Sequence, residues 1–331
     1  MRQKRALSPA VVLFFLAPMV GELLSGSAPP AEFFNPFSLL ILAALYGSGA
    51  ILARELVRRW GKGWPTLLTL GAAYGILEEG LMVKSFFDPQ WVDLGVLGSY
   101  GRWAGVNWVW SLELTIYHAV FSITIPILLV TLMFPDKKSQ PWIGRRTFRL
   151  LALLLTADVV FATLALTPYR PPLVPYVLAA LVAASLVVLA RRLPGSHPTT
   201  VLPTRRAPRP FWVWALGLGA TLAFFLLSWG LPNTGVLPMV TMLLIAGLAA
   251  GVGWLAVGWI RGRAGWPDRH ALALATGGLS FFVLLAPLQE LGRARPDNTA
   301  GMAFVGLTAV GLLMWIGRRL RRSLFARAAP G

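Results

Sequence analysis

Long apolar stretches separated by short polar segments recur along the whole chain. A helix that crosses the hydrocarbon core of a bilayer needs about 20 predominantly apolar residues, and ten stretches approach or exceed this length. They cover residues 9–27, 37–57, 64–84, 106–134, 148–168, 173–190, 211–229, 236–260, 271–291 and 300–317. The pattern predicts an all-α fold, a polytopic membrane helix bundle of about ten transmembrane helices.

The basic residues lie mainly in every second polar segment, counted from the amino terminus. The alternate segments hold only Arg102, Arg170, Arg293 and Arg295 of the 30 Lys and Arg residues. Because cytoplasmic loops are rich in Lys and Arg, this alternation predicts that both termini lie in the cytoplasm and that the protein is a multi-pass protein of the cell (inner, or cytoplasmic) membrane. A missed or additional helix would invert every later loop, so the charge pattern also supports the count of ten.

The composition agrees with a chain whose surroundings are the lipid bilayer. Hydrophobic residues make up 56% of the chain and charged residues 13%, whereas soluble domains carry about 25% charged residues. A net charge of +17 would indicate a nucleic-acid partner in a soluble protein, but here the charges stand at helix ends, so we expect no nucleic acid. The chain has no cysteine, which excludes disulfides, a thiol nucleophile and a thiolate metal site.

The first apolar stretch has two interpretations. A basic start, an apolar run and small residues near positions 25–28 resemble a cleaved signal peptide. Glu22 interrupts the approach to that cleavage point, and Pro29 and Pro30 follow it. We therefore favour an uncleaved helix and interpret residues 1–331 as a single integral membrane domain.

Ionisable side chains inside the predicted helices are distributed unevenly. Such groups are costly in lipid, so they usually face the interior of a bundle and indicate function. The first five stretches contain Glu22, Glu78, Glu79, Lys84, Glu113, His118 and Asp158, and the last five contain Glu290. We therefore interpret residues 1–170 as the half that holds a polar site and residues 171–331 as a scaffold half.

The third stretch combines small and acidic residues on one face. Gly71 and Gly75 form a GxxxG pair that allows another helix to approach closely. Glu78 and Glu79 continue this face at three and four residues from Gly75, so at least one carboxylate should meet a neighbouring helix. A second pair, Gly247 with Gly251, is expected to pack in the same way.

Four polar residues are predicted to converge in the outer half of the membrane. Counted at about 1.5 Å per residue from the outer helix ends, Glu79 and Glu113 lie at similar depth and His118 about one and a half turns deeper. Two adjacent carboxylates at such depth repel each other unless one is protonated or a cation lies between them. We therefore expect Glu78, Glu79, Glu113 and His118 to be catalytic or substrate-binding, with Glu79 and His118 as possible metal ligands.

Each of the polar residues also has a simpler interpretation. His118 could be a packing residue with a hydrogen bond, and Glu113 could reach the outer interface. Lys84 is expected to extend its ammonium group outward to the interface. Asp158 either forms a hydrogen bond with a neighbouring threonine, Thr156 or Thr163, or joins the site. The connection 88–105, rich in Gly and aromatic residues, should fold back on the outer membrane surface.

The glutamate pair followed by a histidine on a later helix resembles the CPBP and PrsW group of intramembrane proteases. The resemblance implies that Glu78 and Glu79 activate water and that His118 is a metal ligand. It covers about two of the ten helices. The CPBP pattern has Arg four residues after the second glutamate, where this chain has Val83, and the PrsW pattern has Lys three residues after it, where this chain has Met82.

The histidines depart from the family pattern as well. His118 with Ser122 matches the spacing of the HxxxN/D element, but with Ser in the last position. His197 and His270 belong to the inner side, so a second intramembrane histidine is missing. A metal site with two histidines is therefore not expected, whereas a carboxylate-rich site with one histidine is compatible with the sequence.

Three functions of different classes remain. In the leading hypothesis an acidic intramembrane site binds or transports a small solute or cation, and Glu22 and Glu290 add negative charge toward the outer face. This hypothesis requires no cofactor, although a divalent metal is possible. In the second, Glu78 or Glu79 is the general base of a peptidase, with Glu113 and His118 orienting a metal or the substrate. In the third, the protein is a non-catalytic membrane scaffold.

Overall fold

A computed structural model describes residues 7–195, 208–260, 267–292 and 297–328, and helices dominate these residues. Every one of the ten predicted stretches is helical. The α-helices are α1 (Pro9–Pro18), α2 (Pro30–Phe33), α3 (Pro36–Leu42), α4 (Ser48–Arg59), α5 (Trp64–Gly75), α6 (Trp108–Tyr117), α7 (Ile125–Met133), α8 (Arg145–Phe161), α9 (Leu173–Arg192), α10 (Pro210–Phe225), α11 (Pro238–Ile260), α12 (Asp268–Leu291) and α13 (Met302–Ala328).

Six π-helical turns extend or interrupt these helices. They are η1 (Met19–Leu23), η2 (Ala43–Gly47), η3 (Ile76–Met82), η5 (His118–Thr124), η7 (Ala162–Leu166) and η8 (Leu226–Gly230). The 3₁₀ turns are η4 (Gly95–Gly98), η6 (Pro135–Lys137) and η9 (Leu231–Thr234), and the strands are β1 (Arg102–Trp103) and β2 (Val106–Asn107). The predicted all-α polytopic bundle is therefore confirmed.

Eight helices of the described chain are long and apolar enough to cross a membrane. They are Pro36–Arg59, Trp108–Met133, Arg145–Leu166, Leu173–Arg192, Pro210–Thr234, Pro238–Trp259, Asp268–Leu291 and Met302–Arg322. The apolar helix Pro9–Leu23 is shorter. The continuous helical segment formed by α5 and η3 is not among the eight, because its adjacent glutamates lower its hydropathy.

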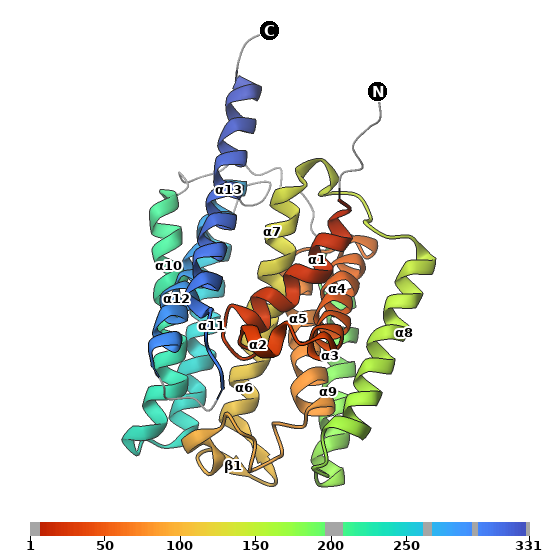
Figure 1. Ribbon diagram of the computed structural model, residues 1–331, viewed down its shortest axis with the longest axis vertical. Helices are drawn as coiled ribbons and strands as arrows, with labels where there is room; N and C mark the ends of the chain where they lie inside the picture. The colour runs from red at the N-terminus through yellow and green to blue at the C-terminus, as the bar shows by residue number, and fades with distance from the viewer. Residues whose placement is uncertain (1–6, 196–207, 261–266, 293–296, 329–331) are drawn as a thin grey trace.

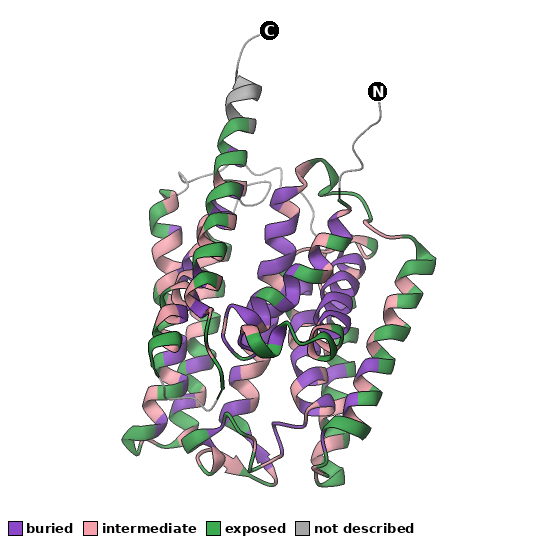
Figure 2. Cartoon of the chain, in the orientation of Figure 1, coloured by how far each residue is buried: buried purple, intermediate pink, exposed green. Residues whose placement is uncertain are grey.

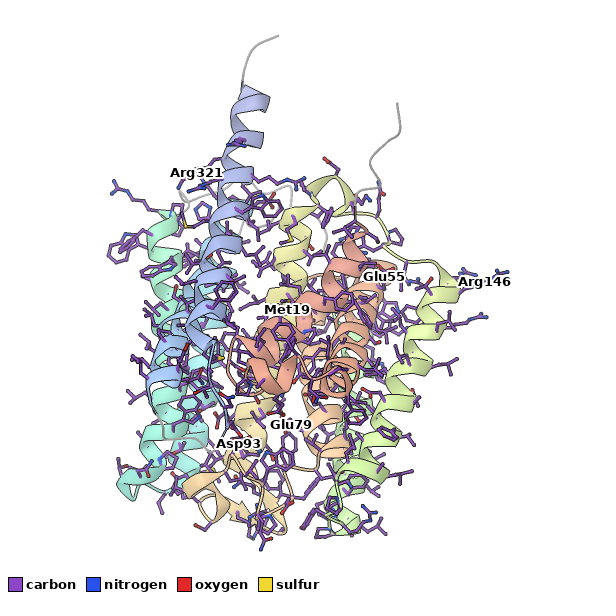
Figure 3. All side chains as sticks on the ribbon, viewed as in Figure 1. Met19, Glu55, Glu79, Asp93, Arg146 and Arg321 are labelled. Carbon is purple, nitrogen blue, oxygen red and sulfur yellow. The ribbon has the colours of Figure 1, made fainter. Side chains whose placement is uncertain are left out.

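The two ends of the bundle differ in charge. Figure 3 places Arg146 and Arg321 at one end and Asp93 at the other, and the β1–β2 hairpin lies at the same end as Asp93 (Figure 1). The start of α1 and the last turns of α13 lie toward the basic end (Figure 1). By the positive-inside rule we expect the basic end to face the cytoplasm.

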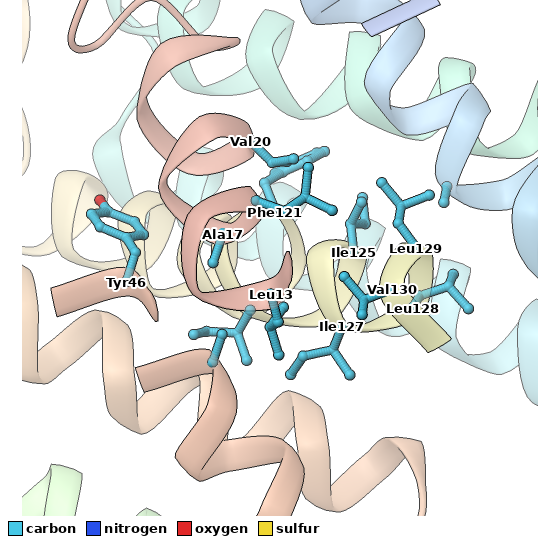
Figure 4. Packing of buried hydrophobic residues seen from close by; sticks show 14 of the residues in the cluster. Leu13, Ala17, Val20, Tyr46, Phe121, Ile125, Ile127, Leu128, Leu129 and Val130 are labelled. Carbon is cyan, nitrogen blue, oxygen red and sulfur yellow. The ribbon is translucent and has the colours of Figure 1, made fainter. Parts of the chain in front are cut away.

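The interior of the bundle is centred on α1 and on the helix formed by α6, η5 and α7. Leu13 and Ala17 of α1 pack toward Phe121 and Ile125 (Figure 4). In the helix Trp108–Met133, 78% of the most apolar stretch of 18 residues is buried inside the bundle. The corresponding buried share is 11% in each of three other helices, Arg145–Leu166, Leu173–Arg192 and Pro238–Trp259. Exposed residues dominate the outer helix α8 (Figure 2). The exposed apolar side chains of these three helices present a lipid-facing surface.

Helix α5 lies against α6 and η5 with almost no space between the backbones. A Cβ added to Gly71 would stand 2.7 Å from the Cα of Ala119, and one added to Gly75 would stand 3.0 Å from the Cβ of His118. The first distance is too short for any Cβ and the second is tighter than most Cβ contacts, so the predicted close contact along this face is confirmed. The expected packing at Gly247 and Gly251 is wrong, because an added Cβ at either residue meets nothing within 4 Å.

The connection 88–105 forms an ordered cap at the outer end. Strands β1 and β2 pair in antiparallel fashion, and the guanidinium of Arg102 donates to the carbonyl oxygens of Phe87 (2.7 Å) and Gly98 (3.0 Å). Burial lowers the pKa of this guanidinium. Asn107 accepts a hydrogen bond from the backbone N–H of Trp110 (3.0 Å) and so caps the start of α6. The cap thus fixes where α6 begins.

Candidate intramembrane site

His118, at the start of η5, contacts both of the adjacent glutamates of η3, Glu78 and Glu79. Its Nδ1 is 3.2 Å from Oε2 of Glu78, and its Nε2 is 3.1 Å from Oε1 of Glu79. Glu78 and His118 are buried, and the side chain of Glu79 is 13% exposed. Glu79 lies nearer to Asp93 than to Glu55 along the bundle (Figure 3). One imidazole therefore contacts both carboxylates in the outer half of the bundle.

Local backbone geometry explains how two neighbouring residues reach the same ring. Glu78 and Glu79 belong to η3, and His118 begins η5. A π turn holds more residues than an α turn, so consecutive side chains diverge by a smaller angle, and such turns occur frequently at functional sites. The close approach at Gly75 brings the two π turns together.

A tyrosine extends the cluster to a third carboxylate. The hydroxyl of Tyr46, in η2, forms hydrogen bonds with Oε1 of Glu78 and with Oε1 of Glu22, which lies in η1. Tyr46 is fully buried. A phenol carries one proton, so one of its two hydrogen bonds requires a proton held by a carboxyl group. At least one carboxyl group of the cluster therefore holds a proton. Without that proton, one of the two hydrogen bonds of Tyr46 cannot form.

Serine hydroxyls contact the other members of the cluster. The Oγ of Ser122 lies 2.9 Å from Nδ1 of His118. The Oγ of Ser85 forms a hydrogen bond with Oε2 of Glu79 and accepts one from the indole Nε1 of Trp110 at 3.0 Å. We call Glu22, Tyr46, Glu78, Glu79, Ser85, His118 and Ser122 the carboxylate–histidine cluster.

Glu113, the fourth predicted site residue, has a different environment. Its Oε1 accepts a hydrogen bond from the indole Nε1 of Trp229 in η8 (2.9 Å), and its buried Oε2 has no hydrogen-bond partner among the described residues. The structure thus joins Glu78, Glu79 and His118 directly, whereas it connects Glu113 to the carboxy-terminal half of the chain. The simpler interpretation, in which Glu113 reaches the outer interface, is wrong because the residue is 2% exposed.

The expectation for Lys84 is also wrong. Lys84 is buried, has a positive φ of 66°, and donates to the carbonyl oxygens of Thr163 (2.7 Å), Thr167 (2.7 Å) and Tyr169 (3.2 Å). Thr163 lies in η7, and Thr167 and Tyr169 follow its carboxy-terminal end, where carbonyl groups lack helical partners and attract a cation. The ammonium group therefore ties the end of η3 to the end of η7 instead of extending outward.

Asp158 and Glu290 do not contact the cluster. Asp158 is buried, and its Oδ2 has no partner among the described residues. The proposed threonine partners bond elsewhere: Thr156 donates to the carbonyl of Ala152 and Thr163 to that of Leu81. Glu290 is exposed and accepts from the backbone N–H of Ala303 at the start of α13 (2.7 Å). Glu290 was expected to add negative charge to an acidic outer cavity, but it forms no hydrogen bond or ion pair with the other acidic residues of the described chain.

A second buried polar group, at the inner end, was missed from the sequence. The guanidinium of Arg54 is 2.5 Å from Oε1 of Glu55, donates to the carbonyl oxygen of Gln140 (2.7 Å) and lies 3.8 Å from the ring centroid of Trp142. The backbone N–H of Trp142 donates to Glu55 (2.9 Å). A carboxylate next to an arginine inside the stretch 37–57 was the available signal. This group anchors the connection between α7 and α8.

The remaining histidines stand apart from the cluster. The Nε2 of His270 lies 2.8 Å from the carbonyl oxygen of Pro208 near the inner end. His197 lies outside the described residues. No second histidine of the described chain therefore joins His118.

The geometry of the cluster suits a metal ion. Glu78, Glu79 and His118 each offer one ligand atom, and these atoms lie within 4.8 Å of one another. Carboxylate oxygens and an imidazole nitrogen are common ligands of Zn²⁺ and other divalent transition metals. Three protein ligands would leave a position open for water or a substrate atom.

The comparisons with known proteins give one result. The sequence model of a protein family, described as an uncharacterized membrane protein family, matches residues 11–320. No curated protein and no solved structure matches the chain. The matched range includes the whole carboxylate–histidine cluster.

Proposed function

The chain belongs to an uncharacterized membrane protein family, and we propose that it binds a divalent cation within the membrane and transports it or a small solute coupled to it. The observation that carries this proposal is the convergence of three ligand atoms, from Glu78, Glu79 and His118, within 4.8 Å of one another. Residues of this kind rarely stand together in a membrane-embedded bundle without a function.

The charge balance of the cluster supports a cationic ligand. Three carboxyl groups, those of Glu22, Glu78 and Glu79, are linked through Tyr46 and His118. Among the described residues, no lysine or arginine forms an ion pair with any of the three carboxylates. A bound cation would offset the repulsion between the two adjacent glutamates.

The position of the cluster supports access from the outer side. Figure 3 shows Glu79 in the half of the bundle that holds Asp93, away from the basic end. The side chain of Glu79 is 13% exposed, and those of Glu78 and His118 are 7% and 2% exposed. Glu79 is therefore the member of this trio that an approaching ion can reach first.

Metal binding by the purified protein tests the proposal directly. The chain in detergent micelles should bind one Zn²⁺ or Co²⁺ ion in isothermal titration calorimetry. Glu79→Gln and Glu78→Gln keep the side-chain shape and remove the charge, so each should weaken binding at least tenfold. Glu290→Gln is the matched control, because Glu290 is exposed and contacts α13 instead of the cluster. Unchanged binding in both cluster variants would contradict the proposal.

Reconstitution separates transport from binding alone. Proteoliposomes that enclose a metal-sensitive dye should take up the ion, and Glu79→Gln should abolish uptake while the protein still inserts and folds. Binding without uptake would restrict the function to a membrane-embedded binding protein. Neither binding nor uptake would favour the scaffold hypothesis.

An intramembrane peptidase is the second candidate, and one observation favours it. Both glutamates of the pair contact the single histidine, and Glu79 is the more exposed of them. Glu79 could thus act as a general base on water while Glu78 and His118 orient the reacting groups. Cleavage of a membrane-spanning reporter peptide, abolished by Glu79→Gln, would establish this function. Ion uptake in the absence of any cleavage would exclude it.

A further inference from the structure

Ser85 stands at the point where the chain leaves η3. Lys84 directly precedes it, with its ammonium group fixed on the carbonyl oxygens of Thr163 and Thr167. The left-handed backbone at Lys84, with φ of 66°, turns the chain back toward the cluster. Ser85 is fully buried, and its hydroxyl reaches Oε2 of Glu79.

The direction of the hydrogen bonds at Ser85 follows from the donor groups. An indole N–H donates and never accepts, so Trp110 donates to the Oγ of Ser85 (3.0 Å). Ser85 has one proton to give, and two oxygens of Glu79 are available. The main-chain oxygen is at 3.4 Å, whereas the carboxylate Oε2 is closer. Trp110 therefore donates to Ser85, and Ser85 donates to Oε2 of Glu79.

Because of these hydrogen bonds, the two oxygens of the Glu79 carboxylate have different partners. Oε2 is held by Ser85, and Oε1 lies 3.1 Å from Nε2 of His118. A carboxylate with one oxygen held in this way presents its other oxygen to a ligand. Glu79 then acts as a one-oxygen ligand, although a free carboxylate can bind a metal through both oxygens.

We infer that Ser85 is a positioning residue that limits Glu79 to one ligand oxygen and so makes the site selective for ions that accept four ligands. This inference rests on the proposed cation site. Three protein ligand atoms and one open position match the tetrahedral preference of Zn²⁺ and Co²⁺. Ca²⁺ takes six to eight oxygen ligands, often from bidentate carboxylates, so the same arrangement disfavours it.

Trp110 is itself fixed, which makes the chain of hydrogen bonds rigid. It is buried in the first turn of α6, and its backbone N–H is capped by Asn107. Partners that orient a metal ligand from outside typically change metal affinity by roughly 10–100-fold when they are removed. Ser85 and Trp110 have this relation to Glu79.

Cobalt binding to the purified full-length chain tests the inference, because the visible absorption of Co²⁺ reports its coordination number. Ser85→Ala should weaken Co²⁺ and Zn²⁺ binding roughly 10–100-fold. It should also lower the preference for Zn²⁺ over Ca²⁺, and it should shift the Co²⁺ bands from the intense four-coordinate pattern toward weaker five- or six-coordinate bands. Trp110→Phe, which keeps the ring and loses the donor, should change the bands in the same direction. A merely structural role would not alter the coordination spectrum.

Ser111→Ala is the matched control, since Ser111 also lies in α6 but donates to the carbonyl oxygen of Asn107 (2.6 Å), away from the cluster. It should leave affinity, selectivity and spectrum unchanged. Wild-type behaviour of both Ser85→Ala and Trp110→Phe would overturn the inference while leaving the cation site itself intact, because Glu79→Gln would still weaken binding at least tenfold. If Ser85→Ala does not fold, Trp110→Phe decides.

Infrared spectroscopy makes the inference testable without any metal. The difference between the wild type and Glu79→Gln isolates the carboxylate bands of Glu79. In Ser85→Ala these bands should move, because Oε2 loses its donor. If the wild type binds no metal, the proposed function fails, and unmoved bands would then overturn the role of Ser85 as well. Moved bands would support the hold of Ser85 on Glu79.

Discussion

At the scale of single residues, buried charge decides how the polar half of the molecule is held together. Lys84 and Arg54 look alike in the sequence, as basic residues near helix ends, yet both are buried and both donate to main-chain oxygens. The sequence shows that such residues exist but not which carbonyl groups meet them, because those belong to elements far away along the chain. Their contacts are therefore tertiary information.

Lys84→Met should destabilise the fold while preserving the size of the side chain. The substitution removes the hydrogen bonds from the ammonium group to the carbonyl oxygens of Thr163, Thr167 and Tyr169, and a hydrogen bond to a charged group contributes about 1.5–3 kcal/mol. These oxygens keep longer hydrogen bonds, from the hydroxyl of Thr167 and from Arg170, which limit the loss. We expect a loss of roughly 3 kcal/mol in reversible unfolding by detergent denaturation. Lys62→Met is the control, since Lys62 is only half-buried and bonds a single carbonyl oxygen. Equal stability of both variants would show that the carbonyl contacts of Lys84 contribute nothing.

At the scale of elements, the sequence predicts the helices well and their interruptions poorly. An apolar run of sufficient length is a local property, which is why all ten stretches are helical. A π turn such as η3 depends on how a helix fits its neighbours, and neither Glu78 nor Glu79 indicates it in the sequence. Depth along the helices predicted that Glu78, Glu79, Glu113 and His118 would converge, and the structure joins three of them. The contact of Glu113 with Trp229 and that of Glu78 with Tyr46 required the structure.

Gly71→Ala tests the close approach of α5 to η5. The added methyl group would stand 2.7 Å from the backbone of Ala119, so the helices must move apart, and we expect a loss of about 1–3 kcal/mol. Gly247→Ala is the matched control, because it also places alanine in a helix but meets open space. Thermal unfolding followed by circular dichroism compares the two. A Gly71→Ala protein as stable as Gly247→Ala would contradict the glycine contact.

At the scale of the whole molecule, burial divides the helices into an interior set and a lipid-facing set. Helices α8, α9 and α11 contribute little to the interior, whereas the helix Trp108–Met133 lies at its centre. The two predicted halves are also less separate than the uneven charge suggests. Helix α9, assigned to the scaffold half, packs against α5 and η3, and Trp229 of η8 contacts Glu113. Charge distribution predicted where polar chemistry lies but not which helices surround it.

Topology can be tested because the chain has no cysteine of its own. Single cysteines at Ser99 and Asn233, at the end that holds the hairpin, should react with an impermeant maleimide added outside intact cells. A cysteine at Ser139, between α7 and α8, should react only after permeabilisation, because basic loops remain in the cytoplasm. Thr200, the other predicted cytoplasmic position, lies outside the described residues. External labelling at Ser139 would reverse the assigned orientation.

The wide turn at η3 has a consequence for how this protein tolerates changes in length. A single deletion within Ile76–Met82, for example of Leu81, lets the segment revert to an ordinary α-helical turn. An α-helical turn holds one residue fewer than a π turn, so it absorbs the deletion, and Lys84 and Ser85 keep their direction on the helix. Glu78 and Glu79 would then diverge by the full angle of about 100° of an α-helix and could no longer both face His118. A one-residue deletion at this point should therefore spare the fold and separate the two carboxylates from the single imidazole.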